Sequence, residues 1–576
     1  MKYSSIPSAQ TVVYNCKANG INNIVISPGS RNAPLTIGFS EDPSFNCYSI
    51  VDERCAAFFA LGIAQQSKKP VALLCSSGSA LLNYYPAIAE AYYSDIPLVI
   101  ITADRPPHKI DIGDGQTIRQ ENVFQNHIGY SANLKLDIRN TNPLGLGDTE
   151  GSQQVSIQRY NEEELLKALN IAFQDKMPVH INVPFEEPLY GVVGKPLMLT
   201  IGAVRKEQEN PFVEDLDEFI KLWNTAKRKM ILVGVHDPSH EVQELLDSVA
   251  NDPSVIVFTE TTSNLHHPNF FGSIDSIIAP IEKSKDKEEL FQKLRPEILL
   301  TFGGLIVSKK IKAFLRKFTP EHHWHIDPKK ANNTFFCLSH HFKVQPIQFF
   351  EVFNGGLVSQ PSNYFSFWNS VKKGYQVKRQ EYMAQIPFSD MLAFHHIFKN
   401  VPNGYQLQLA NSSTIRYAQL FDLDPSLHVF CNRGTSGIDG STSTAIGASI
   451  VHEDPTLFIT GDLSFFYDSN ALWNNHIRSD FRIIVLNNEG GGIFRILPGQ
   501  EDTENFETFF ETVHHMDASH LCQMYQMEYQ MAENEKELDM ALTSFFGKSD
   551  KPKLLEIKTP RVLNNKILLS YFDFIS

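Results

Sequence analysis

The sequence lacks the features that mark membrane, secreted and nucleic-acid-binding proteins. No apolar run approaches the roughly 20 residues that a helix needs to span a bilayer. The first ten residues, MKYSSIPSAQ, contain no apolar segment of the kind found in secretory signals, so no such signal is expected. The net charge of −14 argues against a surface for nucleic acid or anionic lipid, although it leaves room for local basic pockets.

Cysteine is also scarce, and its distribution excludes a disulfide framework. The chain has seven cysteines, none of them in a CxxC pair: Cys16, Cys47, Cys55, Cys75, Cys337, Cys431 and Cys522. An odd and dispersed set in a long chain is typical of reduced thiols. We therefore expect a cytoplasmic protein.

What the chain does contain is enough apolar sequence for several cores. Its 576 residues, 42% of them hydrophobic and 20% charged, correspond to three or four globular domains. Short apolar runs alternate with helical patterns, and this alternation predicts α/β domains with doubly wound parallel sheets. The runs read as strands are 23–27, 45–51, 71–75, 97–103, 179–183, 230–235, 297–302, 406–410, 429–431, 457–459 and 481–486.

Two stretches rich in small and polar residues divide the chain. Residues 190–210 and 354–363 have the composition of linkers. We therefore expect three α/β domains, at residues 1–190, 191–355 and 356–576.

Three further segments carry weaker signals. Residues 131–160 are polar and are expected to be irregular, whereas residues 506–529 are compatible with either a helix or a mobile segment. His322, His323 and His325 could suggest a metal site. Because no third ligand would share a strand face with two of these histidines, we favour a structural role for them.

The most informative pattern lies in residues 456–495. The apolar runs 457–459 and 481–486 are each followed by a polar turn, which contains Asp462 in one case and Asn488 with three glycines in the other. In a parallel sheet both turns lie at the same carboxyl edge, where open α/β sheets bind ligands. Carboxylate, amide and carbonyl oxygens suit Mg²⁺, and glycines let the backbone approach a diphosphate closely. Two ordinary strand-end turns are the alternative.

Gly-Asp followed 26 residues later by Asn-Asn resembles the cofactor motif of the thiamine diphosphate-dependent enzymes. By this resemblance Asp462, Asn488 and the carbonyl oxygen of Gly490 would hold the metal ion, Mg²⁺ or Mn²⁺, that anchors the diphosphate. The resemblance also assigns cofactor contacts to the neighbours Gly461, Leu463 and Ser464. Many relatives have glycine where this chain has Leu463, and one branch of the family shares the leucine.

The same family has a catalytic glutamate in its N-terminal domain, and Glu53 matches it. The resemblance implies that Glu53 contacts N1′ of the cofactor's pyrimidine ring, a role that needs an apolar surround to favour the protonated carboxyl. By position alone, Glu53 could equally be a carboxylate stabilised by a helix N-terminus. Ile438 matches the apolar residue that keeps the cofactor bent in the family, but it could equally belong to the core.

Arginines recur just after the predicted strands. Arg31, Arg105, Arg416 and Arg433 all occupy such positions. Arginine pairs with carboxylates through two hydrogen bonds, and a buried unpaired charge costs several kcal/mol. The arrangement therefore favours a substrate with several carboxylates, with surface or interdomain salt bridges as the alternative for each arginine.

Six segments together resemble the branch of this family that acts in menaquinone biosynthesis: SPGSRNAPL, DERCAAFFALG, TADRPP, NRGTSGIDG, GDLSFFYD and NNEGGGIF. This resemblance covers nearly the whole chain and implies pyrimidine-binding, central and diphosphate-binding domains in that order. Members of the branch join 2-oxoglutarate, with loss of CO₂, to isochorismate, and both are dicarboxylates.

The residues that this resemblance assigns to substrate binding are Ser30, Arg31, Arg105, Gln116, Lys309, Lys310, Arg416 and Arg433. Ser412 would contact a phosphate group or the substrate. For Lys309 and Lys310 a solvated helix start is an equal alternative. Gln116 departs from the family pattern, because Gly115 precedes it where relatives often have asparagine.

The family also implies an assembly. Its members build each site from two subunits, so Glu53 of one chain would meet Asp462 of its partner in a homodimer or homotetramer. Two other functions remain open. One is another thiamine diphosphate-dependent 2-oxo acid decarboxylase or carboligase, and the other is a catalytically silent, nucleotide-binding regulatory protein on the same fold.

Overall fold

The computed structural model describes residues 2–138, 148–197, 214–496 and 503–576. These residues form two compact units. Unit 1 consists of Met1–Gln208, Asn432–Glu453 and Ser464–Phe481, and unit 2 consists of Glu209–Cys431, Asp454–Leu463 and Arg482–Ser576. Both units are built on parallel sheets with helices packed against them, which confirms the predicted α/β class.

A six-stranded parallel sheet with the order β3-β2-β4-β5-β7-β6 forms the centre of unit 1. Its strands are β2 (Asn23–Ile26), β3 (Asn46–Ser49), β4 (Val71–Cys75), β5 (Leu98–Asp104), β6 (Tyr130–Asn133) and β7 (Val179–Pro184). The helices are α1 (Pro7–Ala18), α2 (Ala33–Ser40), α3 (Glu53–Ser67), α4 (Ala80–Asn83), α5 (Tyr85–Ser94) and α6 (Asp148–Gln174). A short antiparallel pair joins β1 (Tyr3–Ser4) to β8 (Val192–Val193).

Continuous apolar runs place β4 and β5 in the middle of this sheet. Every residue of the two strands is buried, as expected of strands that are covered on both faces. Side chains of α1, α2 and α6 form one cluster with alternate strand residues such as Ile24, Leu74 and Ile101. Helix α3 lies against β2 and β4.

Helix α16 (Ser441–Val451) also belongs to unit 1, where it packs closely along α3. A Cβ atom added to Gly62 of α3 would lie 2.1 Å from the carbonyl oxygen of Thr444, and one added to Gly447 would lie 2.0 Å from that of Phe59. Both distances are far below van der Waals contact. The two helices can therefore approach so closely only because glycine occupies both positions.

Unit 2 contains two parallel sheets. The first has the order β10-β9-β11-β12-β13 and the second β15-β14-β16-β17-β19-β18. The strands of the first are β9 (Lys229–Val233), β10 (Val255–Phe258), β11 (Ile298–Phe302), β12 (His322–Ile326) and β13 (Leu338–Phe342). Those of the second are β14 (Gln406–Leu409), β15 (His428–Cys431), β16 (Thr456–Gly461), β17 (Arg482–Asn487), β18 (Glu528–Ala532) and β19 (Lys553–Lys558).

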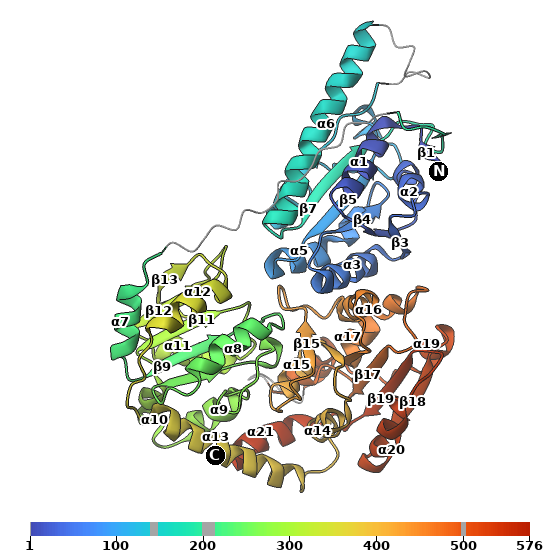
Figure 1. The fold of residues 1–576 in the computed structure, drawn as a ribbon. Helices are drawn as coiled ribbons and strands as arrows, with labels where there is room; N and C mark the ends of the chain where they lie inside the picture. The colour runs from blue at the N-terminus through green and yellow to red at the C-terminus, as the bar shows by residue number, and fades with distance from the viewer. Residues whose placement is uncertain (1, 139–147, 198–213, 497–502) are drawn as a thin grey trace. The chain divides into compact units, whose positions relative to one another are not determined.

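Helices cover both sheets of unit 2 (Figure 1). Those beside the first sheet are α7 (Asp217–Thr225), α8 (His240–Val249), α9 (Asp275–Lys283), α10 (Lys287–Leu294), α11 (Lys309–Lys317) and α12 (Pro346–Phe353). Those of the later part are α14 (Asp390–Asn400), α15 (Ser413–Ala418), α18 (Glu504–Phe506), α19 (Ser519–Met524), α20 (Glu535–Phe545) and α21 (Asn564–Phe574). Helix α17 (Asp462–Tyr467) begins in unit 2 and continues in unit 1.

The long helix α13 (Tyr364–Met383) connects the two sheets of unit 2. Lys372 Nζ donates hydrogen bonds to the carbonyl oxygens of Pro268 and Phe270, at 2.6 and 2.7 Å. Near the C-terminal end of the helix, the Tyr382 hydroxyl donates to the carbonyl oxygen of Ile567 in α21, at 2.7 Å. Unit 2 is therefore held together by polar contacts as well as by its apolar core.

The prediction that residues 131–160 are irregular is wrong for most of the described part of this segment. It contains most of β6 and the first half of α6, while residues 139–147 lie outside the described residues. The buried face of the first half of α6 is polar, since Gln154 donates to Asp137 and Gln158 donates to Thr11, whereas the second half buries apolar residues such as Leu169. A helix that buries glutamines shows no apolar periodicity, which explains why its sequence reads as irregular.

Residues 506–529, for which the sequence allowed a helix or a mobile segment, contain short helices. A turn of π-helix (Glu507–Glu511) follows α18, and α19 comes before β18. Of the predicted linker 190–210, residues 198–210 lie outside the described part of the chain. The predicted domain boundaries remain predictions.

His323 and His325 have structural partners, as predicted. Their ring nitrogens lie 2.9 and 2.8 Å from the hydroxyl oxygen of Thr301 on the neighbouring strand. Burial lowers the pKa of His323 to about 3 and that of His325 to about 4, so both rings stay neutral near pH 7.

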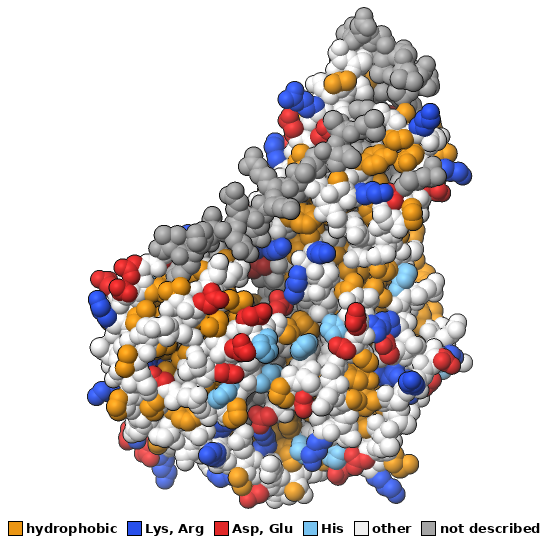
Figure 2. All heavy atoms as spheres, viewed as in Figure 1, with side chains coloured by type: hydrophobic (Ala, Val, Ile, Leu, Met, Phe, Trp, Pro, Cys, Tyr) orange, Lys and Arg blue, Asp and Glu red, His pale blue; other side chains and the backbone are white. Residues whose placement is uncertain are grey.

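Among the described residues, no helix has both the length and the apolar character that crossing a bilayer requires. Figure 2 shows acidic and basic side chains interspersed over the visible part of the described surface.

Candidate active site

Asp462 and Asn488 lie at the same edge of the second sheet of unit 2. Strands β16 and β17 pair in parallel, with Gly461 opposite Leu486. Asp462 follows directly after β16 and Asn488 directly after β17, and both side chains are buried. The prediction that the two polar turns share one edge is therefore confirmed.

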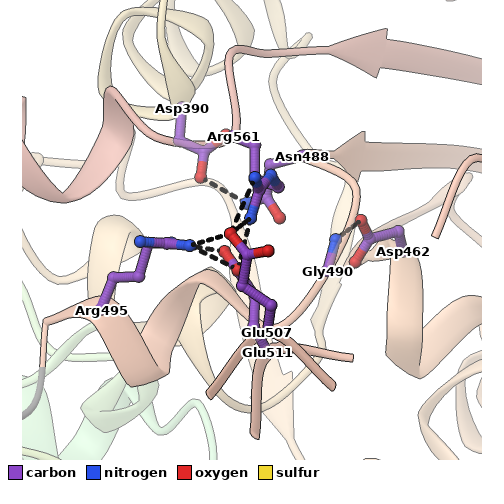
Figure 3. A network of polar contacts seen from close by, with 8 residues as sticks. All are labelled: Asp390, Asp462, Asn488, Gly490, Arg495, Glu507, Glu511 and Arg561. Atoms are coloured by element: carbon purple, nitrogen blue, oxygen red, sulfur yellow. Dashed lines mark hydrogen bonds and ion pairs between the residues drawn. The ribbon is translucent and has the colours of Figure 1, made fainter. Parts of the chain in front are cut away.

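The contacts of these two residues leave one oxygen without a donor. Asp462 accepts a hydrogen bond from the backbone N–H of Leu463 at 2.6 Å. It also accepts one from the backbone N–H of Gly490 at 3.0 Å (Figure 3). Asn488 Nδ2 donates to Asp390 Oδ2 at 2.9 Å, while Asn488 Oδ1 is buried with no hydrogen-bond partner among the described residues. A buried acceptor without a donor is unfavourable, and a cation would compensate it.

The donor set fits a hard divalent cation. The Asp462 carboxylate, the Asn488 amide oxygen and the nearby backbone carbonyls are all oxygen ligands of the kind that Mg²⁺ binds. Gly490 has a φ of 152°, and a Cβ atom there would lie 2.8 Å from the carbonyl oxygen of Glu511. Glycine is therefore required at this position by both conformation and space.

Asp390 positions the amide of Asn488, and the sequence pattern did not reveal it. It is the first residue of α14, where Ser389 caps the helix, and it also accepts a hydrogen bond from the Thr559 hydroxyl at 2.5 Å. Burial raises the pKa of Asp390 to about 6, although the hydrogen bonds from Thr559 and Asn488 lower it. Because its Oδ2 accepts from Asn488 Nδ2, Asp390 sets which side of the Asn488 amide donates.

A buried ion-pair cluster holds the glycine turn that follows Asn488 (Figure 3). Arg495 donates to both oxygens of Glu511 at 2.6 Å, and Arg561 donates to Glu511 Oε2 at 2.6 Å and to Glu507 at 3.1 Å. The backbone carbonyl of Glu511 in turn accepts from Gly491 N–H at 2.6 Å. Because Glu511 is fully buried, breaking this cluster would leave an uncompensated charge, so the cluster stabilises one shape of the turn.

Another residue near this edge is His514, which the sequence did not single out. Its Nε2 lies 3.3 Å from Asp462 Oδ2, and its backbone N–H donates to the carbonyl oxygen of Glu489 at 3.2 Å. The segment 507–514 therefore contacts the turn after β17 at several points.

Glu53 is the first residue of α3 in unit 1. The preceding Asp52 caps the helix by accepting a hydrogen bond from Cys55 N–H at 3.2 Å. The Glu53 side chain is partly buried, and Asn83 Nδ2 lies 3.5 Å from its Oε2. Burial raises the pKa of the Glu53 carboxyl, and the charge of Asp52 raises it further. The protonated form is therefore favoured relative to an exposed glutamate.

The start of α3 is anchored by side chains from a later part of unit 1. Arg54 donates to the carbonyl oxygen of Tyr467 at 3.0 Å and lies 3.4 Å from Asp468. Asn470 donates to Asp52 at 2.8 Å. These contacts hold the helical turn that carries Glu53.

The structure groups some of the predicted substrate-binding residues and separates others. In unit 1, Arg31 and Arg105 both approach Glu187, and Tyr190 donates to the Ser30 hydroxyl at 3.3 Å. Gln116 is exposed, with a φ of 56°.

In unit 2, Ser412 has a φ of 68°, and its carbonyl oxygen accepts from Arg416 Nη1 at 2.6 Å. Lys309 starts α11 and is exposed, and Lys310 pairs with Glu282. Arg433 and Ile438 belong to unit 1. Arg433 follows β15 and is partly buried. The backbone carbonyl oxygen of Ile438 accepts a hydrogen bond from the Ser464 hydroxyl at 3.0 Å.

Comparison with known proteins agrees with this geometry. Residues 8–132 match the N-terminal TPP binding domain of thiamine pyrophosphate enzymes, and residues 411–557 match the C-terminal TPP binding domain. The chain is 57% identical to the 2-succinyl-5-enolpyruvyl-6-hydroxy-3-cyclohexene-1-carboxylate (SEPHCHC) synthase of Christiangramia forsetii over 100% of both chains. The chain belongs to the SEPHCHC synthase family.

Two further SEPHCHC synthases extend the comparison. The Flavobacterium johnsoniae protein is 51% identical over 99% of both chains, and the Porphyromonas gingivalis protein is 39% identical over 100% of this chain and 98% of its own length. As in other SEPHCHC synthases, the cofactor is thiamine diphosphate, and the two matched regions contain Glu53 and the turns at Asp462 and Asn488.

Proposed function

We propose that the protein joins 2-oxoglutarate, with loss of CO₂, to isochorismate and so forms SEPHCHC in menaquinone biosynthesis. The observation that carries this proposal is the 57% identity to a SEPHCHC synthase along the whole of both chains. Thiamine diphosphate, when bound, supplies the electron-accepting centre that 2-oxo acid decarboxylation requires. The residues of this chain bind and orient the reactants around it.

Asp462, Asn488 and the carbonyl oxygen of Gly490 would hold the metal ion, Mg²⁺ or Mn²⁺, and through it the diphosphate. The unpartnered Asn488 Oδ1 and the oxygen-only donor set support this role. Gly461, Leu463 and Ser464 continue the same turn, and Ser412 lies at the end of a strand of the same sheet. We propose cofactor contacts for these four residues as well.

Glu53 would hold a proton on its carboxyl group and share it with a ring nitrogen of the cofactor. Its raised pKa supports this role, because a protonated carboxyl can donate a hydrogen bond. Ile438 would provide an apolar contact to the cofactor. The hydrogen bond from Ser464 to the Ile438 carbonyl supports a defined position for that turn.

The substrate carboxylates and hydroxyls would bind to Ser30, Arg31, Arg105, Gln116, Lys309 or Lys310, Arg416 and Arg433. Two dicarboxylic substrates need several cationic partners, and arginine suits carboxylates best. The side chain of Lys310 already pairs with Glu282, which favours Lys309 as the residue available to substrate.

We propose a homodimer or homotetramer in which each site combines Glu53 of one chain with Asp462 of another. We also propose that the chain has three domains, at residues 1–190, 191–355 and 356–576. A cytoplasmic location remains a prediction from the cysteine usage.

The decisive experiment follows isochorismate by its absorbance. We expect consumption only when 2-oxoglutarate, thiamine diphosphate and Mg²⁺ are all present. Consumption with pyruvate in place of 2-oxoglutarate would contradict the substrate assignment and favour another carboligase.

Thermal shift gives a cofactor readout that is independent of turnover. A ligand at 100 times its Kd adds about 2.7 kcal/mol to stability, so thiamine diphosphate with Mg²⁺ should raise the Tm of the wild type clearly. Asn488→Ala should lose most of this shift. Asn400→Ala removes an amide that donates to the backbone carbonyl oxygen of His396 on α14, and this variant should keep the shift. An unchanged shift in Asn488→Ala would argue against the metal site.

A further inference from the structure

Arg31 and Arg105 share one carboxylate oxygen. Arg31 Nη2 donates to Glu187 Oε1 at 2.8 Å, and Arg105 Nη1 lies 3.6 Å from the same oxygen. Each guanidinium is held at a second point as well, because Arg31 Nη1 donates to the carbonyl oxygen of Phe185 at 3.0 Å and Arg105 Nη2 donates to that of Gly115 at 3.1 Å. Glu187 is therefore the group that links the two cations.

Arg31 and Arg105 have few hydrogen-bond acceptors around them. The Arg31 side chain is 4% exposed, and the Nε atoms of Arg31 and Arg105 are both buried with no hydrogen-bond partner among the described residues. The nearby Asp104 is already occupied, since it accepts from Arg105 N–H and from Asn182, and burial raises its pKa to about 6. The two buried Nε–H groups therefore have no acceptor among the described residues, and the more accessible side chain of the pair is Arg105, at 20% exposed.

We propose that Glu187 is a positioning residue that holds Arg31 and Arg105 ready for a substrate carboxylate. This inference rests on the proposed function. Two guanidinium groups repel each other, and a carboxylate shared between them offsets that repulsion. With their Nη atoms held by Glu187 and backbone carbonyls, the two side chains lose rotational freedom before the substrate arrives, so less entropy is lost on binding. The Arg105 side chain, which is 20% exposed, then remains accessible to the incoming carboxylate.

The experiment compares three variants of the full-length holoenzyme. Glu187→Ala removes the shared oxygen, Glu187→Gln keeps an acceptor of the same shape without the charge, and Glu186→Ala is the matched control. Glu186 is the neighbouring carboxylate and pairs instead with Lys109 at 3.0 Å and His108 at 3.4 Å. KM and kcat are measured for 2-oxoglutarate and for isochorismate, and the Tm is measured with and without thiamine diphosphate and Mg²⁺.

We expect Glu187→Ala to raise the KM of at least one substrate by about tenfold or more, as loss of a charged hydrogen-bond partner does, with a much smaller change in kcat. Glu187→Gln should fall between Glu187→Ala and the wild type, and Glu186→Ala should match the wild type. The Tm shift on cofactor binding should be the same in all four proteins. Since a folding defect would lower kcat and the cofactor shift together, this pattern separates positioning from a general structural role.

Two results would overturn the inference: an unchanged KM in Glu187→Ala, or a lower KM, which would make Glu187 a competitor of the substrate. If Glu187→Ala does not fold, the comparison of Glu187→Gln with the wild type decides between these results in the same way.

Failure of the proposed function looks different, because the wild type would then not consume isochorismate with 2-oxoglutarate. In that case calorimetric titration with 2-oxoglutarate tests Glu187 directly, and equal affinity in wild type and Glu187→Ala, or no binding to either, overturns the inference.

Discussion

Glu53 owes its chemical character to its place as the first residue of α3. A helix N-terminus stabilises a negative charge, whereas partial burial and the adjacent Asp52 favour the protonated acid. The pKa of Glu53 is raised, so burial outweighs the stabilising contacts. A raised pKa increases the share of the protonated acid at a given pH, which is the form that the proposed hydrogen bond to the cofactor needs.

Glu53→Gln should therefore abolish turnover without unfolding the protein. The glutamine keeps the size and one hydrogen-bond donor but cannot exchange a proton, and the expected loss in kcat is about 10²-fold or more. The measurement is isochorismate consumption, with the Tm and circular dichroism spectrum as controls for the fold. Activity close to that of the wild type in this variant would remove Glu53 from the mechanism.

At the scale of elements, the contact between α3 and α16 depends on glycine. The backbone of each helix approaches the other at Gly62 and Gly447, so any side chain there meets a carbonyl oxygen rather than a movable side chain. Protein interiors are close-packed, and the interface between these two helices has no space for an additional methyl group. Because α3 also carries Glu53, its packing on α16 bears on the site as well as on stability.

Gly447→Ala should destabilise the protein by about 1–3 kcal/mol, the usual cost of overpacking. The matched control is Gly374→Ala in α13, where an added Cβ atom meets nothing within 4 Å and the site is exposed. Alanine is the better helix former, so this control should be neutral or stabilising by about 0.5–1 kcal/mol. Urea unfolding measures both, and equal stabilities of the two variants would contradict the close contact.

At the scale of the whole molecule, the candidate residues are divided between the two compact units. Glu53, Arg31 and Arg105 belong to unit 1, and Asp462 and Asn488 belong to unit 2. Under the proposed function a site would combine residues from both groups, and symmetric oligomers can bring such residues together from different chains.

Mixing two inactive variants tests whether different chains supply them. If each site uses Glu53 of one chain and Asp462 of another, co-expressed Glu53→Gln and Asp462→Asn chains should regain activity, up to about one quarter of the wild type when two-chain assemblies form at random. Each variant alone, assayed in parallel, should remain inactive. A mixture in which differently tagged chains co-purify but no activity appears would place both residues in one chain.

Much of the fold was predictable because it is encoded locally. β4 and β5 were predicted because a strand buried on both faces consists of consecutive apolar residues. The first half of helix α6 was missed because it buries glutamine and other polar residues, which find partners in other segments: Gln154 in Asp137 and Gln158 in Thr11, 147 positions away. Asp462 and Asn488 were predicted as site candidates because the polar turns after parallel strands share one edge.

The sequence by itself determined the α/β class, the strand-end turns and the residue types that suit a metal-bound diphosphate, since all of these follow from short patterns. Only the tertiary structure decided which distant side chains position them: Asp390 on the amide of Asn488, Arg561 on Glu511, and Glu187 between Arg31 and Arg105. These contacts join residues 50 to 156 positions apart. Their formation depends on the order of strands in each sheet, which no local pattern encodes.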